Sequence, residues 1–187
     1  MAMKRGWVEV VCGPMYSGKS EELLRRIRRA LIARQKVQVF KHGIDDRYSI
    51  DSLVSHDGRK VETIPVKNSK EIFDHLDNPA VLVIDEVQFF DDGIIEVTEE
   101  LINRGIRVIA AGLDRDFKAD PFGPMSGLLA LAEKVDKITA ICVKCGKAAA
   151  YTQRIVDGVP AKKDDPIVMV GAKNSYEARC RDCYQLA

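Results

Sequence analysis

The segment from Gly13 to Ser20 constrains the fold of this chain more than any other feature. It reads Gly-Pro-Met-Tyr-Ser-Gly-Lys-Ser, which is the G-x-x-x-x-G-K-S pattern of phosphate-binding loops. Glycines let the backbone turn tightly, so that successive N–H groups can point at a phosphate, and the lysine adds a positive charge for the β- and γ-phosphates. The serine hydroxyl is a suitable oxygen ligand for Mg²⁺. The pattern therefore predicts binding of ATP with Mg²⁺ through Gly13, Pro14, Met15, Tyr16, Ser17, Gly18, Lys19 and Ser20.

Both flanks of this loop support that prediction. Trp7–Cys12 is a short apolar run with β-branched residues, which favours a strand. A phosphate-binding loop needs a strand before it and a helix after it, because the positive end of the helix dipole then faces the anion. A glycine-rich turn without a ligand is the less favoured alternative. The helix is predicted from apolar residues at helical spacing, namely Leu23, Leu24, Ile27, Ala30 and Leu31.

Composition narrows the class of protein. The 187 residues are 46% hydrophobic and 30% charged, which fits one globular domain with a small appendage. The net charge of +1 gives no overall field that would recruit nucleic acid or a membrane surface. Met1–Gly6 is followed by only a short apolar run, so we expect neither a signal peptide nor a membrane span, and a cytoplasmic location.

The predicted first helix carries a cluster of arginines, at positions 25, 26, 28 and 29. Such a cluster can be a nucleic-acid-binding arm. Glutamates on the same helix argue otherwise, because Glu21–Arg25 and Glu22–Arg26 are spaced as i,i+4 pairs. The sequence therefore favours a solvated helix face.

Ala80–Glu86 is the second chemical landmark. Its apolar run predicts a central strand that is buried on both faces and ends in two carboxylates, Asp85 and Glu86. Ligands bind at the carboxyl ends of strands in open α/β sheets. Adjacent side chains leave a strand in opposite directions, so we expect the two acids to have different tasks. A solvated strand terminus without a ligand is the less favoured alternative.

Two polar loops leave alternatives open. Asp45-Asp46-Arg47-Tyr48 could assist a magnesium-bound nucleotide, or it could be an exposed loop that its own ion pair holds. Phe117 and Phe122 lie in a polar loop after the predicted strand Arg107–Gly112. They could wall a pocket for a base by stacking, or they could anchor the loop to the core.

The remaining periodicity completes an α/β pattern. It predicts a strand at Val37–Lys41, a short helix at Asn68–Leu76 with Asn68 as its N-cap, and a longer helix at about Asp92–Arg104. Further on, Tyr151–Val156 and Pro166–Val170 are predicted as two strands around a polar connection.

Five cysteines without a secretory signal indicate a reducing compartment. Four of them form two C-x-x-C pairs, which predicts a closed, structural zinc site rather than a catalytic one. Disulfides are the less favoured alternative, and the fifth, Cys12, is predicted to be a small buried side chain. The predicted ligands are Cys142, Cys145, Cys180 and Cys183.

These motifs together resemble those of the cellular, zinc-containing thymidine kinases. The resemblance runs from Val8 to Tyr184. It rests on Gly13–Ser20, Asp45–Tyr48, Ser55–Asp57, Ile84–Phe90, Ala111–Gly123, Tyr151–Arg154 and the four paired cysteines. It implies a RecA-like P-loop α/β domain with a mainly parallel sheet over residues 1–138, and a small zinc-ribbon-like domain with a substrate-covering lasso loop over residues 139–187.

The resemblance also assigns roles to residues. By it, Glu86 corresponds to the catalytic base, and the nucleotide and Mg²⁺ contacts include Asp45, Arg47, Asp85 and Gln88. The residues similar to those around the nucleoside are Met15, Phe89, Leu113, Phe117, Phe122, Thr152, and, in the lasso, Ile167, Val168, Met169, Val170, Gly171 and Tyr176. The implied reaction is phosphorylation of the 5′-hydroxyl of thymidine, and more weakly of deoxyuridine, by ATP in pyrimidine salvage. A homotetramer that dTTP inhibits is the implied assembly.

Two other classes of protein share parts of this pattern. A small RecA-like motor would show an ATPase activity that DNA stimulates, and a zinc-ribbon nucleotide sensor would bind ATP without turnover. Lys19, Ser20, Asp85 and Glu86 together disfavour the sensor, because they form a complete set for phosphoryl transfer.

Overall fold

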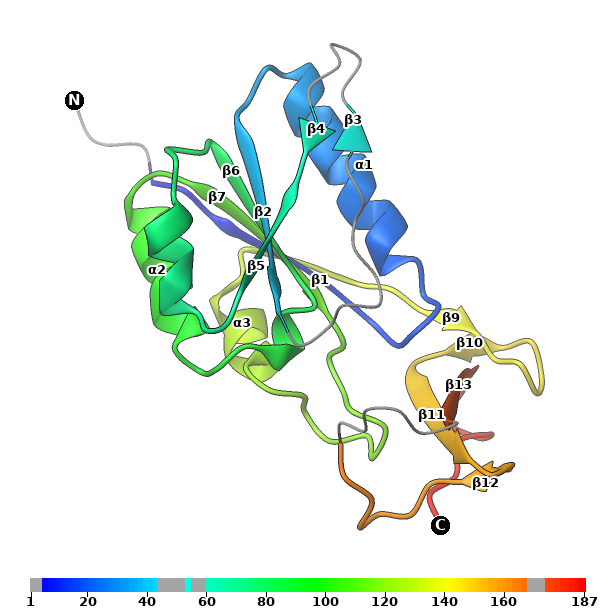
Figure 1. Cartoon of the computed structure of the whole chain (residues 1–187). Helices are drawn as coiled ribbons and strands as arrows, with labels where there is room; N and C mark the ends of the chain where they lie inside the picture. The colour runs from blue at the N-terminus through cyan, green and yellow to red at the C-terminus, as the bar shows by residue number, and fades with distance from the viewer. Residues whose placement is uncertain (1–4, 44–52, 55–59, 168–173) are drawn as a thin grey trace.

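A computed structural model describes residues 5–43, 53–54, 60–167 and 174–187. Its centre is a six-stranded sheet with the strand order β5-β2-β6-β7-β1-β8, in which every neighbouring pair is parallel (Figure 1). The strands are β1 (Val8–Cys12), β2 (Val37–His42), β5 (Thr63–Val66), β6 (Val81–Asp85), β7 (Arg107–Gly112) and β8 (Lys134–Lys137). The expected α/β class with a mainly parallel sheet is confirmed.

Helices cover both faces of the sheet, so the central strands are buried throughout. Helix α1 (Lys19–Ile32) packs on one face, and α2 (Ile94–Asn103) and α3 (Met125–Leu131) pack on the other (Figure 1). Side chains of β6 alternate between the two layers: Val81 and Val83 pack with α1, whereas Leu82 and Ile84 pack with α2 and α3. None of the helices in the described ranges is long and apolar enough to span a membrane.

The segment predicted as a helix at Asn68–Leu76 forms a 3₁₀-helix, η1 (Lys70–His75), instead of an α-helix. Its N-cap is Ser69 and not the predicted Asn68, although the Asn68 side chain accepts a hydrogen bond from the backbone N–H of Glu71 at 3.1 Å. A second 3₁₀-helix, η2 (Val87–Phe89), follows β6 directly. Strands β3 (Leu53–Val54) and β4 (Lys60–Val61) form a short antiparallel pair.

The arginine-rich face of α1 is only partly solvated, which corrects the sequence interpretation. Arg26 is 2% exposed and forms ion pairs with Glu9, Glu22 and Asp136. Glu22, rather than Glu21, pairs with Arg25, at 2.6 Å. The physical reason is the position of Glu9: side chains alternate along β1, and that of Glu9 is on the face that α1 covers. A carboxylate inside the sheet–helix interface needs cationic partners, and Arg26 and Arg107 supply them.

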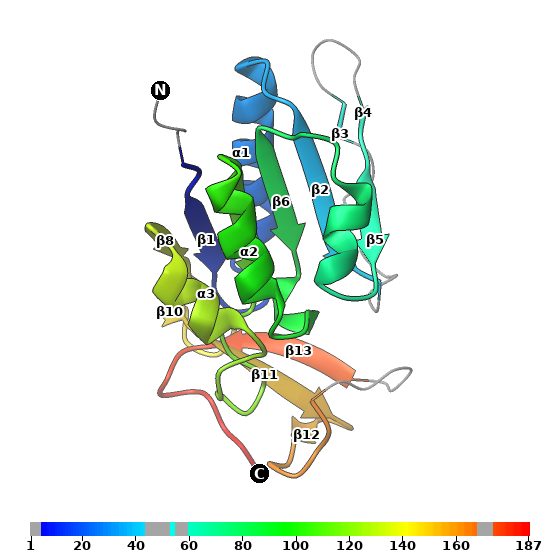
Figure 2. The ribbon, with the colours of Figure 1, turned by 90° about the vertical axis from the view of Figure 1, so that its left-hand side faces the viewer.

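Residues after β8 form small antiparallel sheets. Strands β9 (Ala140–Ile141) and β10 (Ala148–Ala149) pair, and β11 (Tyr151–Val156) lies between β12 (Val159–Pro160) and β13 (Asn174–Arg179). This three-stranded sheet lies beyond the carboxyl ends of the central strands, whose arrowheads point towards it (Figure 2). It therefore faces the edge of the main sheet where the phosphate-binding loop lies.

The predicted strand at Pro166–Val170 is wrong for its first two residues. Pro166 and Ile167 lie in no strand, and positions 168–170 are outside the described residues. The long partner of β11 is β13, and the backbone carbonyls of Pro166 and Ile167 accept hydrogen bonds from Arg154 instead of from a strand.

Candidate functional site

The segment Gly13–Ser20 joins β1 to α1, as the motif requires. Tyr16 and Gly18 have φ angles of 65° and 87°, so the loop turns sharply before the helix begins. The loop is also braced internally, because the Lys19 ammonium and the Ser17 hydroxyl both donate to the backbone carbonyl of Pro14 at 2.8 Å. Burial lowers the pKa of Lys19, while the charges of Glu86 and Asp85 oppose that shift. The lysine and the two acids thus lie within electrostatic reach of one another.

The two acids that end β6 differ in their surroundings. The Asp85 carboxylate accepts the backbone N–H of Glu86 at 2.9 Å. Burial, and next to it the charge of Glu86, raises the pKa of Asp85 to about 7. Glu86 has a φ angle of 49°, a left-handed conformation that costs a non-glycine residue about 1 kcal/mol or more. Such strain is typical of sites where the orientation of a side chain matters, and here it turns Glu86 away from the direction of the strand.

Gln88 connects the ends of β6 and β7. Its side chain is buried, its amide N–H donates to the Glu86 carboxylate, and its carbonyl oxygen accepts the backbone N–H of Leu113 at 3.0 Å. Gly123 lies against the same residue, because a Cβ at position 123 would be 2.3 Å from the backbone carbonyl oxygen of Gln88. Both ends of the Gln88 amide are therefore used to orient its neighbours Glu86 and Leu113.

The loop after β7 carries both phenylalanines that the sequence singled out. Phe122 packs edge-on against Phe89, with ring centroids 5.6 Å apart. Phe117 is 4% exposed, and its ring lies 3.9 Å from the guanidinium carbon of Arg154 on β11. Phe117 therefore anchors the loop to the C-terminal sheet, whereas Phe89 and Phe122 form an aromatic pair near Gln88.

The C-terminal sheet also contacts the phosphate-binding loop directly. The Met15 backbone N–H donates to the Thr152 hydroxyl at 3.0 Å. Thr152 and Arg154 lie on the same face of β11, because side chains on a strand alternate. The structure thus brings together Met15, Phe117, Thr152, Ile167 and Tyr176, all expected near the nucleoside.

Arg154 is the residue at the centre of this group, and sequence reasoning gave it no role of its own. Its guanidinium donates to the Tyr176 hydroxyl at 3.2 Å, to the Pro166 carbonyl at 2.5 Å and to the Ile167 carbonyl. The sequence held one signal for it: Arg154 comes two residues after Thr152 in a predicted strand, so the two side chains are expected on the same face.

Some expected site residues cannot be placed. Asp45, Arg47, Val168, Met169, Val170 and Gly171 lie outside the described residues. An open depression of about 840 Å³ borders the phosphate-binding loop, and Phe117 is not among the residues that line it. It is lined by Ser17, Gly18, Glu21, Glu22, Arg25 and residues 134–138.

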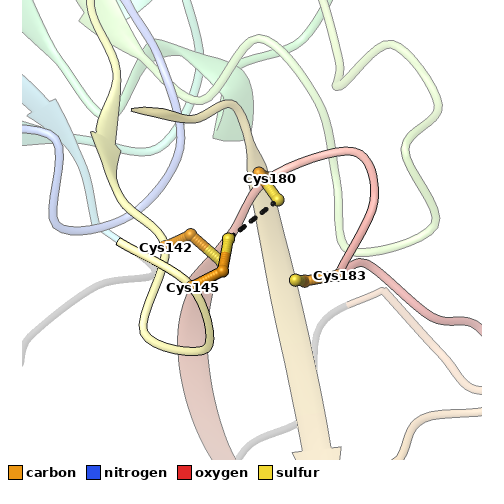
Figure 3. A group of neighbouring side chains, drawn as sticks. All are labelled: Cys142, Cys145, Cys180 and Cys183. Atoms are coloured by element: carbon orange, nitrogen blue, oxygen red, sulfur yellow. Dashed lines mark hydrogen bonds between the residues drawn. The ribbon is translucent and has the colours of Figure 1, made fainter. Parts of the chain in front are cut away.

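Four cysteine side chains converge after β9 and β13 (Figure 3). Their sulfur atoms all lie within 4.8 Å of one another, and those of Cys145 and Cys180 are 3.5 Å apart. Each pair sits on a similar turn, since the Gly146 N–H donates to the Cys142 carbonyl at 2.8 Å and the Tyr184 N–H to the Cys180 carbonyl at 3.0 Å. All five cysteines, including the buried Cys12, are free thiols, and the cluster of four could hold a structural metal ion.

The protonation chemistry of these thiols suits a cation. Burial raises the pKa of the Cys142 thiol, but backbone N–H groups of Cys180, Lys144 and Cys145 outweigh this and lower the pKa to about 6. Hydrogen bonding to Cys145 and Cys180, which favours the protonated Cys183 thiol, instead raises the pKa of Cys183 to about 12. One thiolate therefore forms readily, whereas further thiolates beside it are disfavoured. A divalent cation bound by all four sulfur atoms would offset this repulsion between thiolates.

Comparisons with known proteins agree with this geometry. Among solved structures, the chain is similar to the crystal structure of flagellar accessory protein FlaH from Methanocaldococcus jannaschii, with 14% identity and a TM-score of 0.55 over 78% of this chain and 76% of that chain. That likeness shows the fold alone. A family model described as thymidine kinase matches residues 6–184, and the four-cysteine cluster fits the zinc-containing, cellular type. Because the match spans nearly the whole sequence, the chain belongs to the thymidine kinase family and is a kinase, a phosphotransferase.

Proposed function

We propose that this protein transfers the γ-phosphoryl group of ATP to the 5′-hydroxyl of thymidine, which gives dTMP and ADP. One observation carries the proposal beyond the family match. The ammonium of Lys19 and the carboxylates of Asp85 and Glu86 share one edge of the sheet and influence each other electrostatically. A phosphate-binding lysine beside a strained glutamate is a suitable arrangement for phosphoryl transfer, in which an enzyme mainly positions the reactants and stabilises charge.

The phosphate side of the site consists of the loop and its helix. The backbone N–H groups of Gly13–Ser20 and the start of α1 would bind the phosphates. The Lys19 ammonium now rests on the Pro14 carbonyl, and a phosphate would offer it a stronger, charged acceptor. Ser20 and Asp85 would supply the oxygen ligands that Mg²⁺ prefers, and the raised pKa of Asp85 fits a carboxylate that would gain from a nearby cation. Magnesium would neutralise charge on the phosphates.

The proton of the nucleoside hydroxyl requires a base, and Glu86 is the candidate. Its left-handed backbone and the hydrogen bond from Gln88 fix the direction of its carboxylate. A base positioned in this way contributes about 10²–10⁴ in rate. We assign the acceptance of the 5′-hydroxyl proton to Glu86 and binding of the magnesium-bound nucleotide to Asp85, with Asp45 and Arg47 as further contacts from the resemblance.

The nucleoside would lie between the loop after β7 and the C-terminal sheet. Apolar and aromatic groups there include Met15, Phe89, Leu113, Phe117 and Phe122. They favour the thymine methyl group by about 1–3 kcal/mol, so deoxyuridine should be a poorer but real substrate. The base edge would meet Thr152, Tyr176 and backbone groups near Ile167, and cytosine, with its opposite donor and acceptor, would leave groups there unpaired.

Further properties follow the resemblance alone and are part of the proposal. They are a role in pyrimidine salvage, feedback inhibition by dTTP, a homotetramer, a cytoplasmic location and a division into a nucleotide domain (1–138) and a zinc domain (139–187). The metal of the four-cysteine site is proposed to be Zn²⁺, because four thiolates in two close pairs suit its tetrahedral preference.

A panel of nucleosides with ATP tests the proposed reaction. We expect kcat/KM to fall in the order thymidine, deoxyuridine and then, far behind, deoxycytidine and purine nucleosides. Equal use of deoxycytidine would contradict the pocket. Stimulation of ATP hydrolysis by DNA, without nucleoside phosphorylation, would instead indicate a motor.

A further inference from the structure

Arg154 is an unusual buried cation. It is 1% exposed, and among the residues that the structure describes it forms no ion pair with a carboxylate. The other buried arginines do: Arg26 pairs with three acids and Arg179 with Glu177. A buried charge is costly unless its hydrogen-bonding groups have partners. The groups that Arg154 contacts in place of an acid therefore indicate its role.

Those partners are neutral and come from separate segments. The guanidinium donates to the Pro166 and Ile167 carbonyls and to the Tyr176 hydroxyl, and its central carbon lies 3.9 Å from the centre of the Phe117 ring. Tyr176 is directly opposite Arg154 in the β11–β13 pairing. Arg154 is thus the contact shared by the loop after β7, strand β13 and the turn at 166–167.

We propose that Arg154 is a positioning residue for the nucleoside, through the Phe117 ring, the Tyr176 hydroxyl and the turn at 166–167. The inference rests on the proposed function, because it takes these groups as the surroundings of thymidine. A guanidinium suits the task, since its planar fork can donate to several acceptors while one face lies on a ring. A lysine keeps the charge but offers a point-like group that cannot replace this geometry.

A positioning role and a purely structural role of Arg154 predict different changes in the kinetic constants on substitution. Arg154→Lys should raise the KM for thymidine about 10- to 100-fold, because carbonyls and a ring lose their orienting partner. The KM for ATP and kcat at saturating thymidine should stay within about twofold. Arg179→Lys is the matched control, because Arg179 is a buried arginine of the same sheet whose contacts are Glu177 and the Cys183 carbonyl.

A double-variant cycle adds a second readout. Phe117→Leu removes the ring that Arg154 covers. If Arg154 acts partly through that ring, Arg154→Lys should raise the thymidine KM less in the Phe117→Leu protein than in the wild type. Independent, multiplying effects would contradict positioning through Phe117.

The closing experiment measures thymidine and ATP kinetics, zinc content and thermal unfolding for the wild type and each variant. A selective rise in thymidine KM for Arg154→Lys, absent from Arg179→Lys, supports the inference. Equal changes in the two variants, parallel rises in both KM values, or loss of folding or zinc confined to Arg154→Lys would overturn it. A wild type that phosphorylates no nucleoside would contradict the proposed function itself, whereas an active wild type with an unaffected Arg154→Lys variant would contradict only the role of Arg154.

Discussion

At the scale of single residues, the two acids at the end of β6, Asp85 and Glu86, show how neighbours in sequence acquire different surroundings. Asp85 continues the strand and has a pKa raised to about 7, first by burial and then by Glu86. Glu86 leaves the strand in a left-handed conformation and is held by Gln88. The prediction that the two acids have different tasks rested only on the alternation of side chains along a strand. The left-handed backbone at Glu86 separates the two side chains further, and alternation could not predict it.

Substitution of each acid should therefore have a different effect. Glu86→Gln should lower kcat by about 10²–10⁴ and leave the affinity for ATP nearly unchanged, because it removes a base and keeps the shape of the side chain. Asp85→Asn should instead raise the concentration of Mg²⁺ needed for activity. Steady-state kinetics over a magnesium series, with a separate measurement of ATP binding, distinguish the two. Identical magnesium-dependent defects in both variants would refute the division.

Glu22 allows a prediction about acid stability. Hydrogen bonds from Arg25, followed by one from Arg26, lower its pKa from the usual 4.5 to about 2 despite partial burial. A carboxyl group whose pKa is lower in the folded state stabilises the fold above the unfolded value, and that contribution disappears as the pH falls from about 4.5 to about 2. Because Glu22 is partly exposed to screening solvent, the contribution is about 1 kcal/mol.

Glu22→Gln should lower the free energy of unfolding at pH 6 by that amount and show no deficit near pH 2. Urea unfolding of the wild type and the variant between these pH values measures the difference. Glu21→Gln is the control, since Glu21 forms no ion pair within the described part of the chain. A constant difference across the whole pH range would show that the ion pairs do not cause the effect.

Arg26 and Arg154 show the limit of sequence reasoning at this scale. Both were part of recognisable patterns, a basic helix and the Tyr-Thr-Gln-Arg run. Their burial depends on partners far away in the sequence, Glu9 and Asp136 for Arg26 and Phe117 for Arg154. A local pattern gives the residue type and its face, but it does not give the tertiary partner that makes a buried charge tolerable.

At the scale of elements, local patterns predicted the central ones well. Helix α1 and strands β6 and β7 lie where they were predicted, because each has a clear apolar pattern. Strand β11 also lies where it was predicted, although Thr152, Gln153 and Arg154 in it are polar. Strand β8 (Lys134–Lys137) was missed, since its residues are mostly charged and it lies at the sheet edge. Helix α3 (Met125–Leu131) was missed too. The predicted strand at Pro166–Val170 failed for Pro166 and Ile167 because Arg154 binds their carbonyls.

The contact between the loop after β7 and η2 depends on one glycine. Gly123 has a φ angle of 51°, and a Cβ there would meet the backbone carbonyl oxygen of Gln88 at 2.3 Å. Gly123→Ala should destabilise the fold by about 2–3 kcal/mol, because backbone strain adds to a displacement of Gln88. It should also lower kcat, since Gln88 orients Glu86.

Gly158→Ala provides the matched control for this prediction. Gly158 also has a positive φ angle, 84°, but a Cβ there would meet nothing within 4 Å. It should therefore show the backbone cost alone, about 1 kcal/mol, and normal kcat. Denaturant unfolding and kcat of the two variants make the comparison. Equal losses of stability and activity would mean that the Gln88 contact is unimportant.

At the scale of the whole molecule, the candidate site lies where the central sheet and the C-terminal sheet meet. Met15 donates to Thr152, the Tyr184 hydroxyl donates to the Phe117 carbonyl at 2.6 Å, and Arg154 covers the Phe117 ring. The sequence predicted the class of fold and the cysteine cluster, because motifs and periodicity are local. Strand order and the contact between the sheets depend on long-range packing, and no local pattern determined them.

The cysteine cluster and the loop after β7 are linked through Tyr184, which directly follows Cys183. Elemental analysis should find about one zinc per chain. Cys183→Ser should lose the metal, destabilise residues 139–187 and raise the thymidine KM, because assembly of such a site is coupled to folding and Tyr184 would release Phe117. Binding of ATP to the phosphate loop should be much less affected. Zinc content, thermal unfolding and the two KM values test this together.

Two control variants distinguish the effect of losing the metal from the effect of losing the Tyr184–Phe117 hydrogen bond. Cys12→Ser should keep its zinc, because Cys12 is a buried thiol of β1 with a pKa raised to about 11 by burial, away from the cluster. Tyr184→Phe should also keep its zinc but lose the hydrogen bond to the Phe117 carbonyl, which predicts a rise in thymidine KM of about tenfold or less. If Tyr184→Phe behaved like the wild type while Cys183→Ser lost thymidine affinity, the zinc site would act through the fold as a whole. If neither changed the thymidine KM, the proposed coupling between zinc and nucleoside binding would be wrong.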